Sequence, residues 1–416
     1  MFKNLKKVLV AGLVLTAMVA PSYTSSANDS TGLTKEGHTK EELDAYWKGY
    51  KSQAKDKWDY YGLDLIAPNS KEVYAKAYTD DGKEAGKLSA TTLNDSLHVI
   101  NTMRYMAGLD EVSLDSSKNE KAQAASYVNY LNNNTSHNPN KPSQMKSSKL
   151  YELGKTGAGE SNLHYGSQGF FAQVVSQMRD TTGDNPNHLG HRRWLLDPNA
   201  KTMGVGGVGA YGAVHVIGSY SANTEVVAWP SKASYSQVFG EGTAWSVLIG
   251  KDSGIKINSA KVQVEDLSTN KEETYTKGQG LKVNTEGFGW SDALIFGANL
   301  DTSPGKNYQV KVQGLTKNGK AYPIIYNVNF VSTGQSTSEN EEPVEKSDDT
   351  EENSQTTIEK IKVALESNKK KLGALEVVKK YMPESYKRYK SVIDEATKAA
   401  EKSIAAAEAW LANNEK

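Results

Sequence analysis

Hydrophobic and polar positions repeat with two different periods along this chain. Apolar residues recur every three or four positions, the spacing of one helix face, over about residues 38–62, 92–107 and 117–132. Gln168–Met178 is predicted to be a further helix. Beyond Pro198 the chain becomes glycine-rich and β-branched, as in MGVGGVGAYGAVHVIGSY, which predicts strands. Helices followed by a small sheet predict an α+β domain over residues 85–225.

The next hundred residues have an almost wholly strand-like pattern. Segments such as AKVQVEDLST, ALIFGANL and YQVKVQGLT alternate apolar and polar positions and are separated by Gly, Asn, Asp and Ser. Short strands at this regular spacing predict an all-β sandwich of immunoglobulin-like size over residues 226–335.

The C-terminal part divides into a linker and a helical unit. Residues 336–357 are strongly acidic and offer almost nothing to bury, so we expect a disordered linker. Residues 358–416 carry two amphipathic stripes, and Pro383 is suited to the first turn of the second helix. This pattern predicts a C-terminal helical hairpin.

The N-terminus has the features of an export signal. Lys3, Lys6 and Lys7 precede an apolar run, Val8–Ala20, and small residues follow at positions 25–27. This order predicts a signal peptide over residues 1–27. No second long apolar stretch follows, so we expect a secreted protein without a transmembrane segment. Residues 28–84 would form an N-terminal helical segment.

Composition excludes some kinds of chemistry. The chain has no cysteine, which excludes disulfides, thiolate nucleophiles and Cys-ligated metals. Without the three signal lysines, 46 of the 49 basic residues remain against 49 acidic ones, a net charge of −3. Nucleic acid is therefore not expected as a partner, because binding it needs a basic excess to neutralise phosphates.

Four polar residues close to predicted helix ends are the candidates for a site. His137 lies in NTSHNP, Glu160 in GAGESN, Asp180 after VVSQMR, and His191 in GHRRW. Imidazoles and carboxylates are the ligands of zinc, and equally the groups of acid–base catalysis. The residues alone leave both alternatives open.

Four segments in this order resemble the motifs of one protein family. They are INTMRYMAGLDEVSLD, the alanine-rich helix ending at His137-Asn138-Pro139, GESNL, and GHRRWLLDPNAKTMGVG. They resemble the CAP superfamily of cysteine-rich secretory, antigen 5 and pathogenesis-related 1 proteins, in its bacterial form. The resemblance implies an α-β-α sandwich with a cleft that contains two histidines and two acids.

The resemblance assigns roles to particular residues. His137 and His191 would be the two histidines, with Glu160 and Asp180 as the acids, and this set would bind Zn²⁺ or another divalent cation. Ser161 separates Glu160 from Asn162, so either Glu160 or Ser161 takes the first acid's position. Structural roles around the cleft would belong to Asn101, Arg104, Asn162, Arg192 and Trp194.

We expect structural or surface roles for the other arginines and histidines. Arg192 and Arg193 would pair with acids or stack on Trp194. We expect His188 on a surface loop, with a second-ligand role as the alternative. Packing or surface positions are expected for His98, His164 and His215.

Two classes of function remain. The favoured one is a secreted binding module for a lipid, sterol or peptide, held at the cell wall by contact of its C-terminal helices with a cell-envelope component. The alternative is a secreted, peptidase-like hydrolase that uses a metal-bound water or a His/Glu pair, with His137, Glu160 and His191 as catalytic candidates. Binding is favoured over catalysis because no activated Ser or Thr nucleophile is evident and the acid placement is irregular.

Overall fold

The computed structural model describes residues 31–49, 73–166, 170–218, 225–332 and 390–414, with six single positions between 362 and 379. The predicted signal peptide, the second half of the helix predicted at 38–62, and the linker at 336–357 lie outside the described residues. Within those ranges, no helix is both long and apolar enough to cross a membrane.

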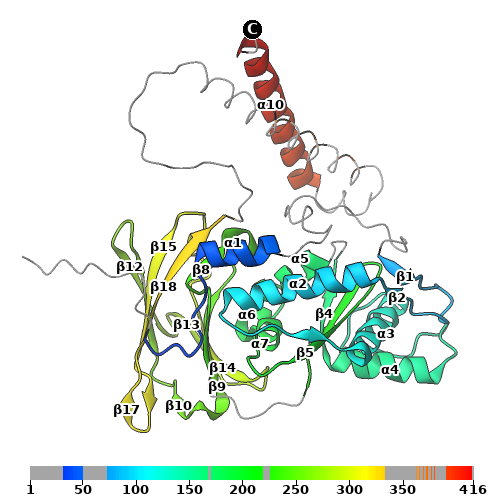
Figure 1. Cartoon of the computed structure of the whole chain (residues 1–416), viewed down its shortest axis with the longest axis horizontal. Coiled ribbons are helices and arrows are strands. Elements are labelled where there is room, and N and C mark those ends of the chain that lie inside the picture. Colours follow the sequence, from blue (N-terminus) through cyan, green and yellow to red (C-terminus); the bar gives the residue numbers. More distant parts are fainter. Residues whose placement is uncertain are drawn as a thin grey trace, which may run out of the picture.

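The first part of the protein is a four-stranded sheet with helices on both faces (Figure 1). Its strands follow the order β3 (Ser113–Leu114), β5 (Thr202–Val208), β6 (Tyr211–His215) and β4 (Ser161–Tyr165). One face is covered by α3 (Ser116–Asn132), against which α4 (Ser148–Gly159) packs. The other face is covered by α2 (Ala90–Met106), α5 (Phe170–Arg179) and α7 (Gly190–Leu195), with the short α6 (Asn185–His188) preceding α7. The predicted mixture of α and β structure is confirmed.

Local sequence explains where these elements begin and how closely they pack. Ser89 caps α2 by accepting a hydrogen bond from the backbone of Thr92, and Asp115 caps α3 in the same way. Gly206 of β5 lies directly under α3, where a Cβ atom would come within 2.1 Å of the Gln123 backbone nitrogen. The glycine-rich strand therefore allows the helix to approach the sheet closely.

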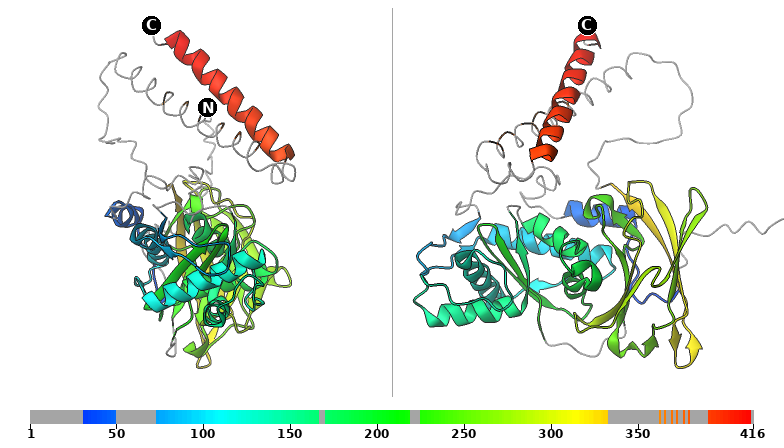
Figure 2. Two further views of the ribbon diagram at one scale, coloured as in Figure 1. Left: turned by 90° about the vertical axis from the view of Figure 1, so that its right-hand side faces the viewer. Right: turned by 180° about the vertical axis from the view of Figure 1, so that it is seen from behind.

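The second part is a single nine-stranded sheet that curls over on itself. Its strands follow the order β7 (Val226–Trp229), β9 (Trp245–Gly250), β14 (Ser291–Phe296), β13 (Gly280–Asn284), β12 (Lys271–Lys277), β11 (Lys261–Asp266), β15 (Asn307–Gln313), β18 (Ile324–Val331) and β8 (Ala233–Tyr235). Trp245 makes ring contacts with Tyr308 at 5.3 Å and Phe330 at 5.6 Å, on strands that are not its neighbours. The two halves of the sheet therefore face each other, as Figure 2 shows from behind. The predicted immunoglobulin-like sandwich of separate sheets is not confirmed.

Small elements complete the described structure. The strands β1 (Tyr74–Lys76) and β2 (Lys87–Leu88) form a ribbon, and β10 (Ile255–Lys256), β16 (Thr316–Lys317) and β17 (Lys320–Ala321) form a three-stranded sheet. The 3-10 turns η2 (Ser236–Val238) and η3 (Lys251–Ser253) flank β9.

The N-terminal segment contacts both parts. Thr31 forms a bridge with Ile325 of β18, and Lys35 forms one with Val227 of β7. Further along, α1 (Lys40–Gly49) packs on α2, where the Tyr46 and Tyr105 rings stack at 4.2 Å. This segment therefore links two strands of the curled sheet before the chain enters the first part.

Two arginines of α7 also join the two parts. Arg192 is fully buried and donates to the carbonyl oxygen of Ala244 at 2.8 Å and to Ser246 Oγ at 3.1 Å. Arg193 donates to Asn284 Oδ1 at 2.8 Å. We expected these side chains to pair with acids or to stack on Trp194. Their hydrogen bonds go instead to neutral oxygens, several of them on the second sheet, while nearby acids act on the two guanidinium groups only through their charge. Stacking on Trp194 stays a prediction. One continuous hydrophobic core runs through both parts.

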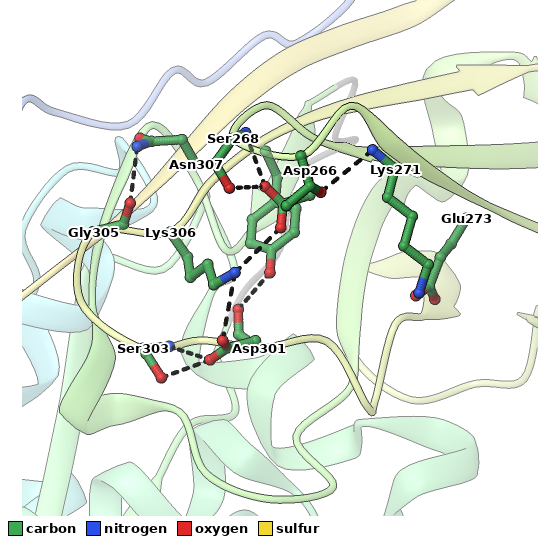
Figure 3. A network of polar contacts seen from close by, with 11 residues as sticks. Asp266, Ser268, Lys271, Glu273, Asp301, Ser303, Gly305, Lys306 and Asn307 are labelled. Carbon is green, nitrogen blue, oxygen red and sulfur yellow. Dashed lines mark hydrogen bonds and ion pairs between the residues drawn. The ribbon is translucent and has the colours of Figure 1, made fainter.

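A salt-bridged network fixes one end of the curled sheet (Figure 3). Lys306 Nζ lies 3.2 Å from Asp266 Oδ2 and 3.6 Å from Asp301 Oδ2. The Tyr308 hydroxyl donates to the Asp301 carbonyl at 2.7 Å. The ammonium group thus lies between two carboxylates and ties the end of β11 to the loop before β15.

At the C-terminus, α10 (Lys390–Asn414) stands apart from both sheets (Figures 1 and 2). Ion pairs join Lys379 to Asp394 at 3.4 Å and Lys369 to Glu408 at 3.0 Å. The order of these pairs fits an antiparallel arrangement. The helical hairpin stays a prediction, because most of its first helix lies outside the described residues.

Candidate functional site

Asp180 and His191 form a tightly coupled pair at the end of α5 and the start of α7. Asp180 has a left-handed backbone conformation, with φ of 52°, which is unusual for a residue other than glycine. Its Oδ1 accepts a hydrogen bond of 2.6 Å from His191 Nδ1, and its Oδ2 accepts one of 3.1 Å from the Arg192 backbone N–H. The carboxylate is fully buried, whereas the His191 side chain is 20% exposed. With Nδ1 as the donor, Nε2 of the neutral ring is an acceptor.

Polar side chains surround this pair. Asn162 Nδ2 donates to the His191 carbonyl oxygen at 2.9 Å and lies 3.4 Å from Gln177 Oε1. The amide nitrogen of Asn185 is 3.5 Å from His191 Nδ1. The two contacts of Asn162 hold the first turn of α7 against β4 and α5.

His164 is a residue of this site that the sequence analysis placed among packing or surface residues. It follows Asn162 by two positions on β4, so both side chains lie on the face that meets α7. Burial, and then the nearby His191, lowers the pKa of His164 to about 4. Its Nε2 atom is buried and has no hydrogen-bond partner within the described part of the chain. The alternation in ESNLHY was the signal that could have grouped Asn162 with His164.

Glu160 lies in a separate cluster. It caps the C-terminus of α4, and its Oε2 accepts hydrogen bonds from Lys121 Nζ at 2.7 Å and His215 Nε2 at 2.8 Å. Burial acts to raise the pKa of Glu160, but the hydrogen bonds from Lys121 and His215 outweigh it and the net shift is downward. His215, only 3% exposed, has its pKa lowered by burial. Ser161 is the first residue of β4, and its buried Oγ has no hydrogen-bond partner in the portion of the chain that the structure describes.

His137 lies in the exposed loop after α3. Its Nδ1 is 2.8 Å from the Ala158 carbonyl oxygen. Because a carbonyl only accepts, Nδ1 carries the proton, and Nε2 is left as the acceptor of the neutral ring.

The four predicted ligands are not gathered around one point. Glu160 contacts Lys121 of α3, on the sheet face where Leu163 and Ala213 pack against the same helix. His164 and His191 lie on the opposite face. Among the residues that the structure describes, no group of three or more His, Asp and Glu side chains could hold a metal ion. As arranged here, these residues do not fit a divalent cation, and the cation expected from the resemblance stays a prediction.

The residues expected to be structural have extensive contacts. The Asn101 side chain exchanges hydrogen bonds of 2.9 and 3.0 Å with the backbone of Val112. The buried Arg104 guanidinium donates to the carbonyl oxygens of Asp110, Leu195 and Asp197. Burial lowers the pKa of Arg104 to about 10. Trp194 is half-buried and packs against the hydrophobic core.

Part of the chain matches a known protein family. Residues 97–218 match the family model described as the cysteine-rich secretory protein family (CAP). This stretch runs from α2 to just beyond β6 and includes the Asp180–His191 pair. No curated protein and no solved structure matches the chain.

Proposed function

We propose, since residues 97–218 are a CAP domain, that this chain is a secreted binding protein whose CAP domain holds a peptide ligand at His191. The observation that supports this is the hydrogen bond of 2.6 Å between Asp180 and His191. A buried carboxylate fixes the imidazole and its tautomer, so that Nε2 is held ready as an acceptor for a ligand N–H. Such preorganisation lowers the entropy cost of binding.

A peptide suits the surroundings of His191 better than a lipid or a sterol. The neighbours of the pair are the amides of Asn162, Gln177 and Asn185 and a second imidazole, that of His164. Binding an apolar ligand would remove the hydrogen bonds that these groups make to water. The ligand would offer none in their place, which is unfavourable. A peptide backbone supplies donors and acceptors that match amides and imidazoles.

The rest of the chain would present this site at the cell surface. The buried arginines hold the curled sheet and the CAP domain as one body, so the sheet would act as a spacer. The C-terminal helices would attach to a cell-envelope component. Deleting residues 357–416 should release the protein from the wall while peptide binding persists, and equal wall association of both forms would contradict this part.

The alternative function, a peptidase-like hydrolase, has one observation in its favour. A carboxylate that orients an imidazole through Nδ1 leaves Nε2 positioned as a general base for an attacking water. The left-handed conformation of Asp180 is a strain of the kind that concentrates at functional sites.

One experiment separates these functions. The protein is incubated with a tryptic digest of casein, and mass spectrometry records which peptides are retained and whether any are cut. We expect retention without cleavage by the wild type and much weaker retention by His191→Ala. Tyr165→Ser is the matched control, because this exposed residue lies on β4 with its side chain directed to the opposite face from His164.

Each outcome has a clear meaning. Cleavage that His191→Ala abolishes would favour the hydrolase. Retention of sterol-containing vesicles but of no peptide would contradict the peptide assignment. Equal retention by the wild type and His191→Ala would contradict the site.

A further inference from the structure

His164 has an unsatisfied polar atom next to the residue that is proposed to bind the ligand. Its Nε2 is buried, and none of the residues that the structure describes is a hydrogen-bond partner for it. Buried imidazole nitrogens are normally paired, because an unpaired one costs free energy comparable to a lost hydrogen bond. A hydrogen-bond partner supplied by a ligand would satisfy this atom.

The register of β4 explains why the two histidines are neighbours. Side chains alternate along a strand, so Asn162 and His164 lie on one face. Asn162 holds the His191 backbone at 2.9 Å. His164 and His191 are close enough for the charge of one ring to act on the other. The two imidazoles thus come from different elements, one from the edge strand β4 and one from α7.

Gly166 lies directly beside the unpaired atom. A Cβ atom at this position would lie 2.9 Å from His164 Nε2. The backbone of Gly166 has no positive φ, so its conformation is open to other residues. Any side chain here would nevertheless crowd the imidazole nitrogen.

We propose that His164 and His191 together bind the N–H and C=O groups of one ligand residue. His191 Nε2, whose ring is oriented by Asp180, accepts from the ligand N–H, and His164 Nε2–H donates to the ligand C=O. The ligand class is therefore an extended peptide, which is recognised through its backbone N–H and C=O groups. This inference rests on the proposed function. It adds a second binding residue and specifies that the peptide backbone is the part of the ligand that is bound.

The smallest suitable probe is N-acetyl-L-alanine methylamide, which carries one residue with both groups. The full chain, labelled with ¹⁵N-histidine, is titrated with this probe, and long-range ¹H–¹⁵N spectra follow each imidazole. We expect the ring nitrogens of both His164 and His191 to shift together, while those of His215 stay unchanged. The analogue in which an ester oxygen replaces the alanine N–H should bind about tenfold more weakly, because it lacks the donor to His191.

Two variants test His164 itself. Gly166→Ala places a methyl group against Nε2, and His164→Phe removes the donor while keeping a planar ring. Each should weaken probe binding about tenfold, the effect of losing one buried hydrogen bond. Tyr165→Ser should bind as the wild type does. Gly166→Ala keeps the test decisive if His164→Phe fails to fold.

The outcomes separate this inference from the proposed function. If only His191 shifts, and Gly166→Ala binds the probe normally, the role of His164 is overturned while peptide binding at His191 stands. If neither histidine shifts at probe saturation, both are overturned. A joint shift that Gly166→Ala abolishes supports both.

Discussion

Arg193, on α7 of the CAP domain, and Asn284, on β13 of the curled sheet, are joined by a hydrogen bond of 2.8 Å. The same guanidinium donates to the carbonyl oxygens of Glu286 and Ser291, and its side chain is fully buried. Arg193 is only two residues from His191. The segment that carries the candidate site therefore also carries the contact between the two sheets, so the geometry of the site depends on a domain outside the family match.

Replacing Arg192 should destabilise both parts of the protein together. Arg192→Met would leave the carbonyl oxygens of Met178 and Ala244 unpaired inside a shared core. We expect the free energy of unfolding to fall by about 3 kcal/mol, because several hydrogen bonds to a buried charge are lost. Urea unfolding followed by tryptophan fluorescence would measure this in a single transition. The control is Lys201→Met, at an exposed position. If Arg192→Met lowers the free energy of unfolding by no more than Lys201→Met does, the role of Arg192 is contradicted.

The helices around the CAP sheet could be predicted because their signals are local. The predictions at 92–107 and 117–132 agree with α2 and α3 to within a few residues, since helix periodicity and the caps at Ser89 and Asp115 are all contained in the segment itself. The curled sheet was not predictable in the same way. Which strands pair is decided by contacts between distant segments, such as Trp245 with Phe330.

The candidate site shows the same division. Sequence motifs placed Asp180 and His191 in one site, and the structure joins them by a hydrogen bond. The motifs gave no indication that Lys121 and His215 would both donate hydrogen bonds to the Glu160 carboxylate. These two partners come from α3 and β6 and meet only in the folded protein. His164 was missed because the alternation that groups it with Asn162 covers only one short strand, and the partner element α7 that makes this face part of the site is distant in the sequence.

Removing the acceptor from Asp180 should change the state of the His191 ring. In Asp180→Asn only one oxygen remains, so the side chain can accept from His191 Nδ1 or from the Arg192 N–H but not from both. We expect a mixture of His191 tautomers in ¹⁵N spectra and a free energy of unfolding lower by about 2 kcal/mol. Asp184→Asn, at an exposed position nearby, should leave both unchanged. An unaltered His191 spectrum in Asp180→Asn would refute the orienting role.

The N-terminal segment should be needed to keep the curled sheet monomeric. Thr31 exchanges two backbone hydrogen bonds of 2.8 Å with Ile325, and Lys35 pairs beside Val227. Deleting residues 28–35 would expose those backbone groups, and unpaired strand edges favour association between chains. We expect dimers or larger species by light scattering. Thr31→Val, which keeps the backbone pairing, should stay monomeric, and a monomeric deletion variant would show that the segment does not protect the sheet.

Asp197 should make the protein less stable as the pH rises through the mildly acidic range. Burial raises the pKa of this carboxyl from 3.8 to about 6, against the opposing effects of the Asn199 N–H and Arg104. Its buried Oδ2 has no hydrogen-bond partner among the described residues. The folded protein then binds the proton more tightly than the unfolded chain does. The carboxyl therefore does not lower the free energy of unfolding below about pH 4, and lowers it most above about pH 6.

The size of this effect follows from the two pKa values. A difference of about two units corresponds to roughly 3 kcal/mol. Asp197→Asn resembles the protonated form at every pH, so the variant should gain up to this much stability over the wild type between about pH 4 and pH 7. Urea unfolding of both proteins across that range measures the difference, with the exposed Asp110→Asn as the control. A difference that does not grow with pH would show that Asp197 keeps an ordinary pKa in the folded protein.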